Sequence, residues 1–205
     1  MSKNYLMFLK LILKKNTLLR VLQICECLDV KLFGLSVEFG AISNKNKTFS
    51  NFVTGKSKFH YSNKVSNQKL NIFFSDLTKK LKISTKKYDN VIIFNVLEHL
   101  PEYKIAFSEI YRILKKKGNF IGSVPFIYQI HGAPKDYFRF SKQFFELNLK
   151  KYGFKKIKVK PLGFGPFIAS YSLVHSYLKF IILKIHIYYY MTCITIININ
   201  YFKFW

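Results

Sequence analysis

Arginine is scarce in this chain. Its 205 residues include 34 lysines and arginines, of which only Arg20, Arg112 and Arg139 are arginine, and the formal net charge is +24. Surfaces that bind nucleic acids favour arginine, because its planar fork recognises phosphate and guanine. We therefore interpret the charge as a lysine-coated surface and do not favour nucleic acid as a partner. RNA binding or RNA methylation stays open as an alternative that rests on charge alone.

Acidic residues are also few, ten in the whole chain. Their positions are informative because half of them fall at or beside predicted strand ends. These five are Glu38, Asp76, Asp89, Glu98 and Asp136. Ligands of parallel α/β folds bind at the carboxyl ends of the strands, so these acids are candidates for a binding site.

The chain has only three cysteines, Cys25, Cys27 and Cys193. This number and spacing fit neither a paired disulfide framework nor a zinc site with four cysteine or histidine ligands. The sequence therefore predicts a reduced, cytoplasmic location and no metal site.

The N-terminal segment, residues 1–30, has a basic flank but no complete signal peptide. Lysines interrupt its apolar stretch, and no small-residue cleavage site follows. We predict an amphipathic first helix instead. Its inward face would comprise Leu6, Leu9, Leu13 and Leu18. Peripheral contact of this helix with an anionic membrane stays open.

The C-terminal segment, residues 161–205, is apolar and aromatic. Residues 185–202 carry no formal charge if His186 is neutral, a length at the lower limit for a membrane span. Tyrosine, threonine and asparagine occupy much of this stretch, and the alternation in ITIININYF is typical of a strand. We favour a helix followed by a strand that completes the sheet, with a membrane-attached tail as the alternative.

The stretch from Tyr88 to Arg139 predicts a strand, a helix, a second strand and a polar loop. The apolar run Asp89–Phe94 is typical of a strand that is buried on both faces. A helix opened by Pro101 and closed by the lysines and glycine at 115–118 should follow, and then a strand over Asn119–Val124. This is a βαβ unit.

Other segments extend the pattern to a single domain with a core over residues 31–160. The remaining predicted strands are Lys31–Phe39, Lys58–Tyr61, Leu70–Phe74 and an edge strand over Phe154–Val159, and the last helix of the core is Ser141–Tyr152. Strands separated by crossovers predict an α/β fold with a doubly wound, mostly parallel sheet and helices on both faces.

With these elements placed, the chain resembles the class I S-adenosylmethionine-dependent methyltransferases. The likeness is to the methyltransferase-11-like group, which is often found among enzymes of surface polysaccharides and other small molecules. The motifs that carry it are VEFGA (37–41), SDL (75–77), FNVLEHLPE (94–102), EIYRILKKKGNFIGSVPF (109–126) and KKYGFKKIKV (150–159). Their order along the chain is more specific than any one of them. The likeness covers residues 35–159, with HGAPKDYFRFS (131–141) as the expected substrate-side loop.

This resemblance implies S-adenosylmethionine as cofactor and a small molecule or glycan precursor as acceptor. The implied cofactor-binding residues are Glu38, Gly40, Ala41, Asp76, Leu77, Phe94 and Asn95. Glu38 would accept a hydrogen bond from the cofactor's amino group or orient the loop, and Asp76 would accept one from the adenine amine. Asn95 would flank the methionine end.

The sulfonium supplies the reactivity in methyl transfer, so the enzyme aligns the acceptor and, where needed, removes its proton. The implied catalytic residues are His99 and His131 as bases, with Asp136 orienting an imidazole, and the substrate would be bound by Tyr137 and Arg139. Each of these residues could instead have a purely structural role. His99 could serve only the adjoining helix, Asp136 could simply pair with Arg139, and Asp76 could cap a helix starting at Leu77.

Two departures from the family pattern bear on the cofactor. The first loop, Gly40 to Asn44, lacks further glycines, and Ser62 and Asn63 stand where an acid usually holds the ribose hydroxyls. An amide there lacks the charge-assisted component of the hydrogen bond. A non-catalytic binding or assembly protein that keeps the fold is therefore the alternative to an enzyme.

Overall fold

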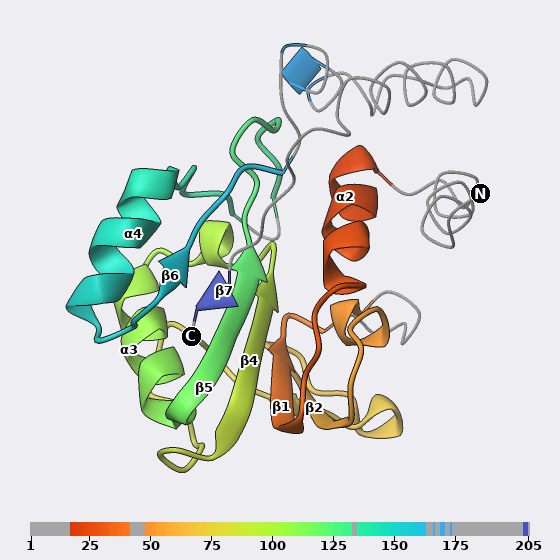
Figure 1. The fold of residues 1–205 in the computed structure, drawn as a ribbon, viewed down its shortest axis with the longest axis vertical. Coiled ribbons are helices and arrows are strands. Elements are labelled where there is room, and N and C mark those ends of the chain that lie inside the picture. The colour runs from red at the N-terminus through yellow and green to blue at the C-terminus, as the bar shows by residue number, and fades with distance from the viewer. Residues whose placement is uncertain are drawn as a thin grey trace.

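A twisted sheet forms the centre of the computed structural model (Figure 1), which describes residues 17–41, 48–132 and 135–162 and positions 166, 169, 170, 173, 203 and 204. The helices in chain order are α2 (Leu18–Cys27), α3 (Tyr103–Ile113) and α4 (Lys142–Lys151). The strands are β1 (Gly34–Phe39), β2 (Ser57–Asn63), β3 (Ile72–Phe74), β4 (Tyr88–Phe94), β5 (Leu114–Ser123), β6 (Ile157–Lys158) and β7 (Lys203–Phe204). Short 3-10 turns are η2 (Phe49–Asn51), η3 (Gln68–Leu70) and η4 (Leu97–His99).

Within the described residues the sheet has seven strands in the order β3-β2-β1-β4-β5-β7-β6. The first five are parallel, with β4 paired to both β1 and β5, whereas β7 runs antiparallel to its two neighbours. The predicted α/β class and mostly parallel sheet are confirmed. The prediction of an antiparallel edge strand near Phe154–Val159 is also confirmed, because β6 lies at the edge and pairs with β7.

The boundary between α3 and β5 differs from the predicted one. The helix ends at Ile113, and the three lysines that were expected to close it lie in β5, which begins at Leu114. The pairing of β4 with β5 shifts register between Tyr88 and Asn90, so the lysine stretch bulges out of the ladder. Lys117 has a positive φ of 69° there. The sequence pattern could not show that the helix ends at Ile113. Leu114 fits the apolar spacing of the helix, but it is buried as part of β5.

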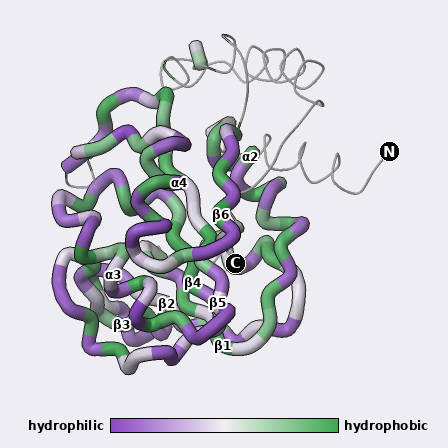
Figure 2. Tube along the Cα trace, turned by 60° about the vertical axis from the view of Figure 1, so that its left-hand side comes forward, coloured by the Kyte–Doolittle hydropathy of each residue, from purple (hydrophilic) through white to green (hydrophobic). Residues whose placement is uncertain are grey.

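Helices cover both faces of the sheet, as predicted. Figure 1 shows α3 and α4 together on one side and α2 on the other. On the α3 and α4 side, Phe107, Ile110 and Leu149 pack with Val91 and Ile93 of β4 in the main hydrophobic core. The trace alternates between hydrophobic and hydrophilic segments (Figure 2), as expected for a sheet covered by amphipathic helices.

The opposite face has a smaller hydrophobic cluster. Its buried residues are Val30, Leu32, Ile92 and Ile121. Ile92 lies between Val91 and Ile93 in β4, so successive side chains of this strand enter different cores. This explains why the strand is an unbroken apolar run.

The terminal segments are described only in part. Thr17 caps α2 by accepting a hydrogen bond from the Arg20 amide at 3.3 Å, whereas Leu6, Leu9 and Leu13 of the predicted first helix lie outside the described residues. The predicted C-terminal strand at ITIININYF also lies outside them, although β7 follows it directly. Among the described residues, no helix is both long and apolar enough to cross a bilayer.

An ion pair fastens α3 to the connection before β4. Arg112 donates to Glu109 Oε1 at 2.8 Å and Oε2 at 2.6 Å, and also to the carbonyls of Ile83 and Leu81 at 2.8 and 3.1 Å. Glu109 in turn accepts the Leu81 amide at 2.7 Å. This arrangement satisfies the main chain of a connection that has no regular structure between β3 and β4.

We expect Arg112→Met to lower the free energy of unfolding by about 2–4 kcal/mol, because it leaves a buried carboxylate and two carbonyls unpaired. Lys142→Met is the matched control, since Lys142 pairs with Glu146 at 3.7 Å on the surface and its loss should change stability by less than about 0.5 kcal/mol. Urea denaturation of both variants measures the difference. Equal effects would show that the Arg112 contacts do not stabilise the fold.

Candidate active site

A cavity of about 460 Å³ lies at the carboxyl ends of β1, β2 and β4. Ligand sites of open parallel sheets are expected at this edge, and the size is within the range of small-molecule pockets. It is lined by Arg20, Glu38, Phe39, Gly40, Phe49, Asn63, Lys64, Val65, Ser75, Leu77, Phe94, Asn95, Val96, His99 and Leu100. The structure thus places six of the predicted site residues around one cavity: Glu38, Gly40, Leu77, Phe94, Asn95 and His99.

Gly40 lines the cavity directly after the end of β1. Its φ of +75° is in the left-handed region, and a Cβ atom there would lie 2.4 Å from Val96 Cγ2. Glycine therefore allows two strand-end loops to approach each other. The next residue, Ala41, is buried and donates its amide hydrogen to the Ser62 carbonyl at 3.1 Å, so it extends the strand pairing without lining the cavity.

Glu38 is buried beneath η2. Its two carboxylate oxygens accept the amide hydrogens of Phe49 and Ser50, each at 2.9 Å. Burial raises the pKa of Glu38, and these hydrogen bonds together with the charge of Arg20 partly offset the rise. Of the two roles predicted for Glu38, the contacts fit the orientation of a neighbouring segment, because both oxygens are used by η2.

Arg20 comes from α2 and lies over the Phe49 ring, with 4.5 Å between its Cζ atom and the ring centroid. Phe49 stacks in turn on Phe94 at a centroid distance of 4.1 Å. A cation and two aromatic rings therefore form one wall of the cavity. The sequence does not indicate this wall, since the wall depends on packing between residues that are far apart in the chain.

Residues at the ends of β2 and β3 also line the cavity. Asn63 stands at the end of β2, where its side-chain nitrogen donates to the Ala41 carbonyl at 2.7 Å and its oxygen accepts the Lys64 amide at 2.7 Å. Asp76 is not among the lining residues. Its Oδ1 accepts from the Thr78 amide and hydroxyl at 2.9 and 2.7 Å. These residues form a turn and not a helix starting at Leu77, so Asp76 does not cap a helix there.

Asn95 joins the cavity to α2. It has a positive φ of 54°, and its amide exchanges hydrogen bonds with the amide of Gln23 at 2.7 and 3.1 Å. Gln23 is fully buried and also lies 2.6 Å from the Ser123 hydroxyl at the end of β5. The N-terminal helix is thereby fixed to the ends of β4 and β5, a contact that the sequence did not indicate.

A second, smaller cavity of about 130 Å³ adjoins the first, because Arg20 and Asn95 line both. Its wall also includes Gln23, Glu98, Tyr128 and His131. His131 of this smaller cavity lies next to His99 of the larger one, with ring centroids 4.9 Å apart. The structure thus brings the two predicted bases together beside the larger cavity, although they are 32 residues apart in the sequence.

The predicted substrate-side loop folds around an ion pair. Arg139 donates to the two carboxylate oxygens of Asp136 at 2.5 and 2.6 Å, and to the Gln129 carbonyl at 3.1 Å. The guanidinium holds the pKa of Asp136 well below its usual range. Asp136 also faces His131, with 3.1 Å between Oδ2 and Nδ1. Tyr137 is half exposed, lines neither cavity and donates its amide hydrogen to the Glu98 carbonyl at 2.9 Å.

Glu98 is the most unusual group of the site. It is 0% exposed, and neither carboxylate oxygen accepts a hydrogen bond. The His99 imidazole lies beside it, with Nε2 3.7 Å from Oε1. Burial raises the pKa of Glu98 to about 8, and the negative charge of Asp136 adds to the rise. The sequence identified Glu98 as an acid near a strand end but could not show that it is buried without a partner.

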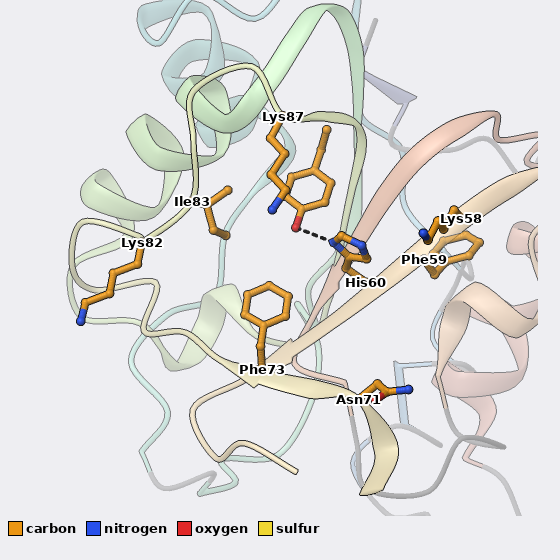
Figure 3. Close-up of a pocket in the computed structure, with 9 residues that line it drawn as sticks. Lys58, Phe59, His60, Asn71, Phe73, Lys82, Ile83 and Lys87 are labelled. Atoms are coloured by element: carbon orange, nitrogen blue, oxygen red, sulfur yellow. Dashed lines mark hydrogen bonds between the residues drawn. The ribbon is translucent and has the colours of Figure 1, made fainter. Parts of the chain in front are cut away.

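A third cavity, of about 500 Å³, lies near the amino ends of β2 and β4 and is drawn in Figure 3. There His60 Nδ1 and the Tyr88 hydroxyl are 3.0 Å apart, and Lys87 lies over the Tyr88 ring. Burial and the charges of Lys87 and Lys58 lower the pKa of His60. This cavity is at the end of the sheet where parallel folds do not place their ligands, so we do not assign it to the active site.

Glu98→Gln should change how stability depends on pH. Because the folded-state pKa of Glu98 is raised from 4.5 to about 8, wild-type stability should fall as pH rises through that window, by at most about 1.4 kcal/mol per pH unit for this group. The variant lacks this loss, so we expect its stability relative to wild type to increase from pH 5 to pH 8.

Urea denaturation at several pH values, with EDTA present to remove bound cations, measures this difference. Glu146→Gln, on the surface of α4, is the control and should follow the wild-type profile. A constant difference between Glu98→Gln and wild type at all pH values would contradict the prediction.

Comparison with known proteins supports the same assignment of fold. The family model described as "Methyltransferase domain" matches residues 53–122. A search of curated proteins finds no match to this sequence. Among solved structures, a chain from a complex between the Haloferax volcanii Trm112 methyltransferase activator and a methyltransferase is 15% identical, with a TM-score of 0.54 over 69% of this chain and 69% of that chain.

Two further structures are similar. Phosphoethanolamine N-methyltransferase 2 of Haemonchus contortus, in complex with S-adenosylmethionine, is 15% identical with a TM-score of 0.54 over 71% of this chain but only 38% of its own. A S-adenosylmethionine-dependent methyltransferase from Thermotoga maritima is 18% identical with a TM-score of 0.50 over 72% of this chain and 76% of that chain. The chain therefore has the fold of the class I methyltransferases, and its residues 53–122 match the methyltransferase domain model.

Proposed function

We propose that this chain transfers a methyl group from S-adenosylmethionine to a small polar acceptor. The observation that carries the proposal is the 460 Å³ cavity at the carboxyl ends of β1, β2 and β4, in a chain with the class I methyltransferase fold. The Haemonchus and Thermotoga proteins with this fold are described as binding or depending on the same cofactor. Both lines of support concern the cofactor.

The lining of the cavity suits the parts of the cofactor. Leu77 and the stacked rings of Phe49 and Phe94 offer apolar surface to the adenine. Arg20 would donate to the methionine carboxylate, for which a guanidinium fork is well shaped. Asn95 would lie at the methionine end, beside the methyl group, and Gly40 lets the cofactor approach the backbone.

The two histidines suit the acceptor side. His99 lines the larger cavity and His131 the smaller one, so an acceptor between them would lie next to the transferring methyl. Nδ1 of His99 is 2.7 Å from the Lys135 carbonyl, and that of His131 is 3.1 Å from Asp136. These contacts leave Nε2 of each ring as the atom that would take a proton from the acceptor. Asp136 would act by orienting the imidazole, with Arg139 holding the carboxylate.

The acceptor would be a small polar molecule or a hydroxyl of a glycan precursor. The smaller cavity, about 130 Å³, has room for a few heavy atoms, and its wall offers Gln23, Tyr128 and His131 as polar contacts. Tyr137, exposed at the edge of the loop, would contact the remainder of a longer acceptor.

A non-catalytic role is the second candidate, and the contacts of Asn63 favour it. The Asn63 amide is occupied by the Ala41 carbonyl and the Lys64 amide at the position where a ribose-binding acid is expected. The cofactor would then lose a charge-assisted hydrogen bond. Cofactor binding without methyl transfer, or no binding at all, would support this role.

Isothermal titration calorimetry with S-adenosylmethionine and S-adenosylhomocysteine tests the cofactor. We expect one site with a Kd in the micromolar range, and Asn95→Gly should weaken binding at least tenfold, or about 1.4 kcal/mol. Asn71→Gly is the matched control, because Asn71 also has a positive φ but lines the third cavity, of about 500 Å³. It should bind as wild type does.

The absence of binding at millimolar concentrations of both ligands would overturn the proposal. Equal weakening by both asparagine substitutions would mean that the 460 Å³ cavity is not where the cofactor binds.

A further inference from the structure

Three potential metal ligands converge between the two cavities of the active site. Glu98 and His99 come from η4, and His131 comes from the loop after β5. Each offers one ligand atom such that all three atoms lie within 4.8 Å of one another. Among the residues that the structure describes, this is the one group of three or more histidine, cysteine or acidic side chains with such spacing.

The hydrogen bonds of the histidines fix which nitrogen is available. Nδ1 of His99 is 2.7 Å from the Lys135 carbonyl, and a carbonyl can only accept. Nδ1 of His131 is near two acceptors, the Asp136 carboxylate at 3.1 Å and the Gln129 carbonyl at 3.3 Å. In the neutral rings Nδ1 therefore carries the proton and Nε2 has the lone pair. Metal-binding histidines typically donate their other ring N–H to a carboxylate or a backbone carbonyl in this way.

Glu98 supplies the negative charge. Its carboxylate is completely buried, and neither oxygen has a hydrogen-bond partner. The other acid of the loop, Asp136, is neutralised by two hydrogen bonds from Arg139. Glu98 is thus the one uncompensated acid facing the histidines, and a buried carboxylate is stabilised by pairing or by coordination to a metal.

We propose that Glu98, His99 and His131 bind a divalent transition-metal ion. Two imidazole nitrogens and one carboxylate oxygen are a common ligand set for zinc, iron and related first-row ions. Magnesium and calcium prefer sets made of oxygen, so they fit less well. Asp136 and the Lys135 carbonyl would accept hydrogen bonds from the Nδ1 atoms of His131 and His99 and so fix the orientation of the two rings.

The site needs only a small closure to bind the ion. Metal–ligand bonds of about 2.1 Å imply distances of about 3.0–3.5 Å between neighbouring ligand atoms. The His99 Nε2 to Glu98 Oε1 distance is already 3.7 Å, and the largest of the three separations is at most 4.8 Å. Rotation of the His131 ring, which is 30% exposed, can supply much of the difference. The same exposure gives the ion a route of entry.

Three protein ligands leave coordination positions open. Because His99 lines the larger cavity and His131 the smaller one, these positions would face the acceptor. A bound ion would then orient an acceptor oxygen and lower its pKa, in place of a histidine base. This consequence rests on the proposed methyltransferase function, whereas metal binding itself does not.

Cobalt(II) is a suitable probe, because its visible absorption reports coordination by protein ligands. Titration of the full chain, after dialysis against EDTA and then buffer, should give one site per chain with a Kd in the micromolar range. Zinc should displace the cobalt. Glu98→Gln and His131→Gln should each weaken binding at least tenfold. Glu98→Gln keeps the size of the side chain and removes only its ability to ionise, so it should remain folded, which circular dichroism checks.

His60→Gln is the matched control. It also removes a histidine from a cavity wall, but one that is paired with Tyr88 away from the site, and it should bind cobalt as wild type does. The proposal is overturned if wild type has no site tighter than about 1 mM or if all three variants bind alike. Calorimetry with S-adenosylhomocysteine on the same samples keeps this result separate from the cofactor proposal.

Discussion

The parallel pairing of β4 with β1 and β5 is the constraint on which the active site depends. Phe39 pairs with Ile93, and Phe94 pairs with Ser123, so the three strands end at the same level of the sheet. The loops that carry Gly40, Asn95 and the residues after Ser123 therefore leave the sheet at one edge. A shift of one residue in this register would turn the β4 side chains to the opposite faces and mix the two cores.

The helix α2 adds side chains to the cavity that the strand ends form. Gln23, buried and hydrogen-bonded to Asn95 and Ser123, ties the helix to two strand ends at once. This polar contact specifies the position of the helix, whereas apolar packing alone would tolerate sliding. Arg20 lies one turn earlier in the same helix and lines the cavity, so α2 is part of the site.

The strand ends were predictable from the sequence because apolar runs and scarce acids mark them locally. The class of fold and the placement of Glu38, Gly40, Phe94 and Asn95 at one edge followed from those runs. Contacts between distant segments were not predictable. The arginines illustrate this: Arg20, Arg112 and Arg139 each lie beside a buried carboxylate, Glu38, Glu109 and Asp136 respectively. In a chain that otherwise uses lysine, the rarity of arginine was a signal for such positions, but it could not identify the partners.

The burial of Glu98 is not explained by the local fold. The backbone carbonyl of Glu98 accepts the amides of Tyr137 and Phe138 at 2.9 and 3.3 Å, so the main chain alone holds the loop against η4. The side chain contributes no hydrogen bond and opposes folding when it is charged. An apolar residue of similar size at this position would make the free energy of folding more favourable. A carboxylate kept there, facing two histidines whose Nδ1 atoms are already engaged, is therefore better explained by a ligand than by stability.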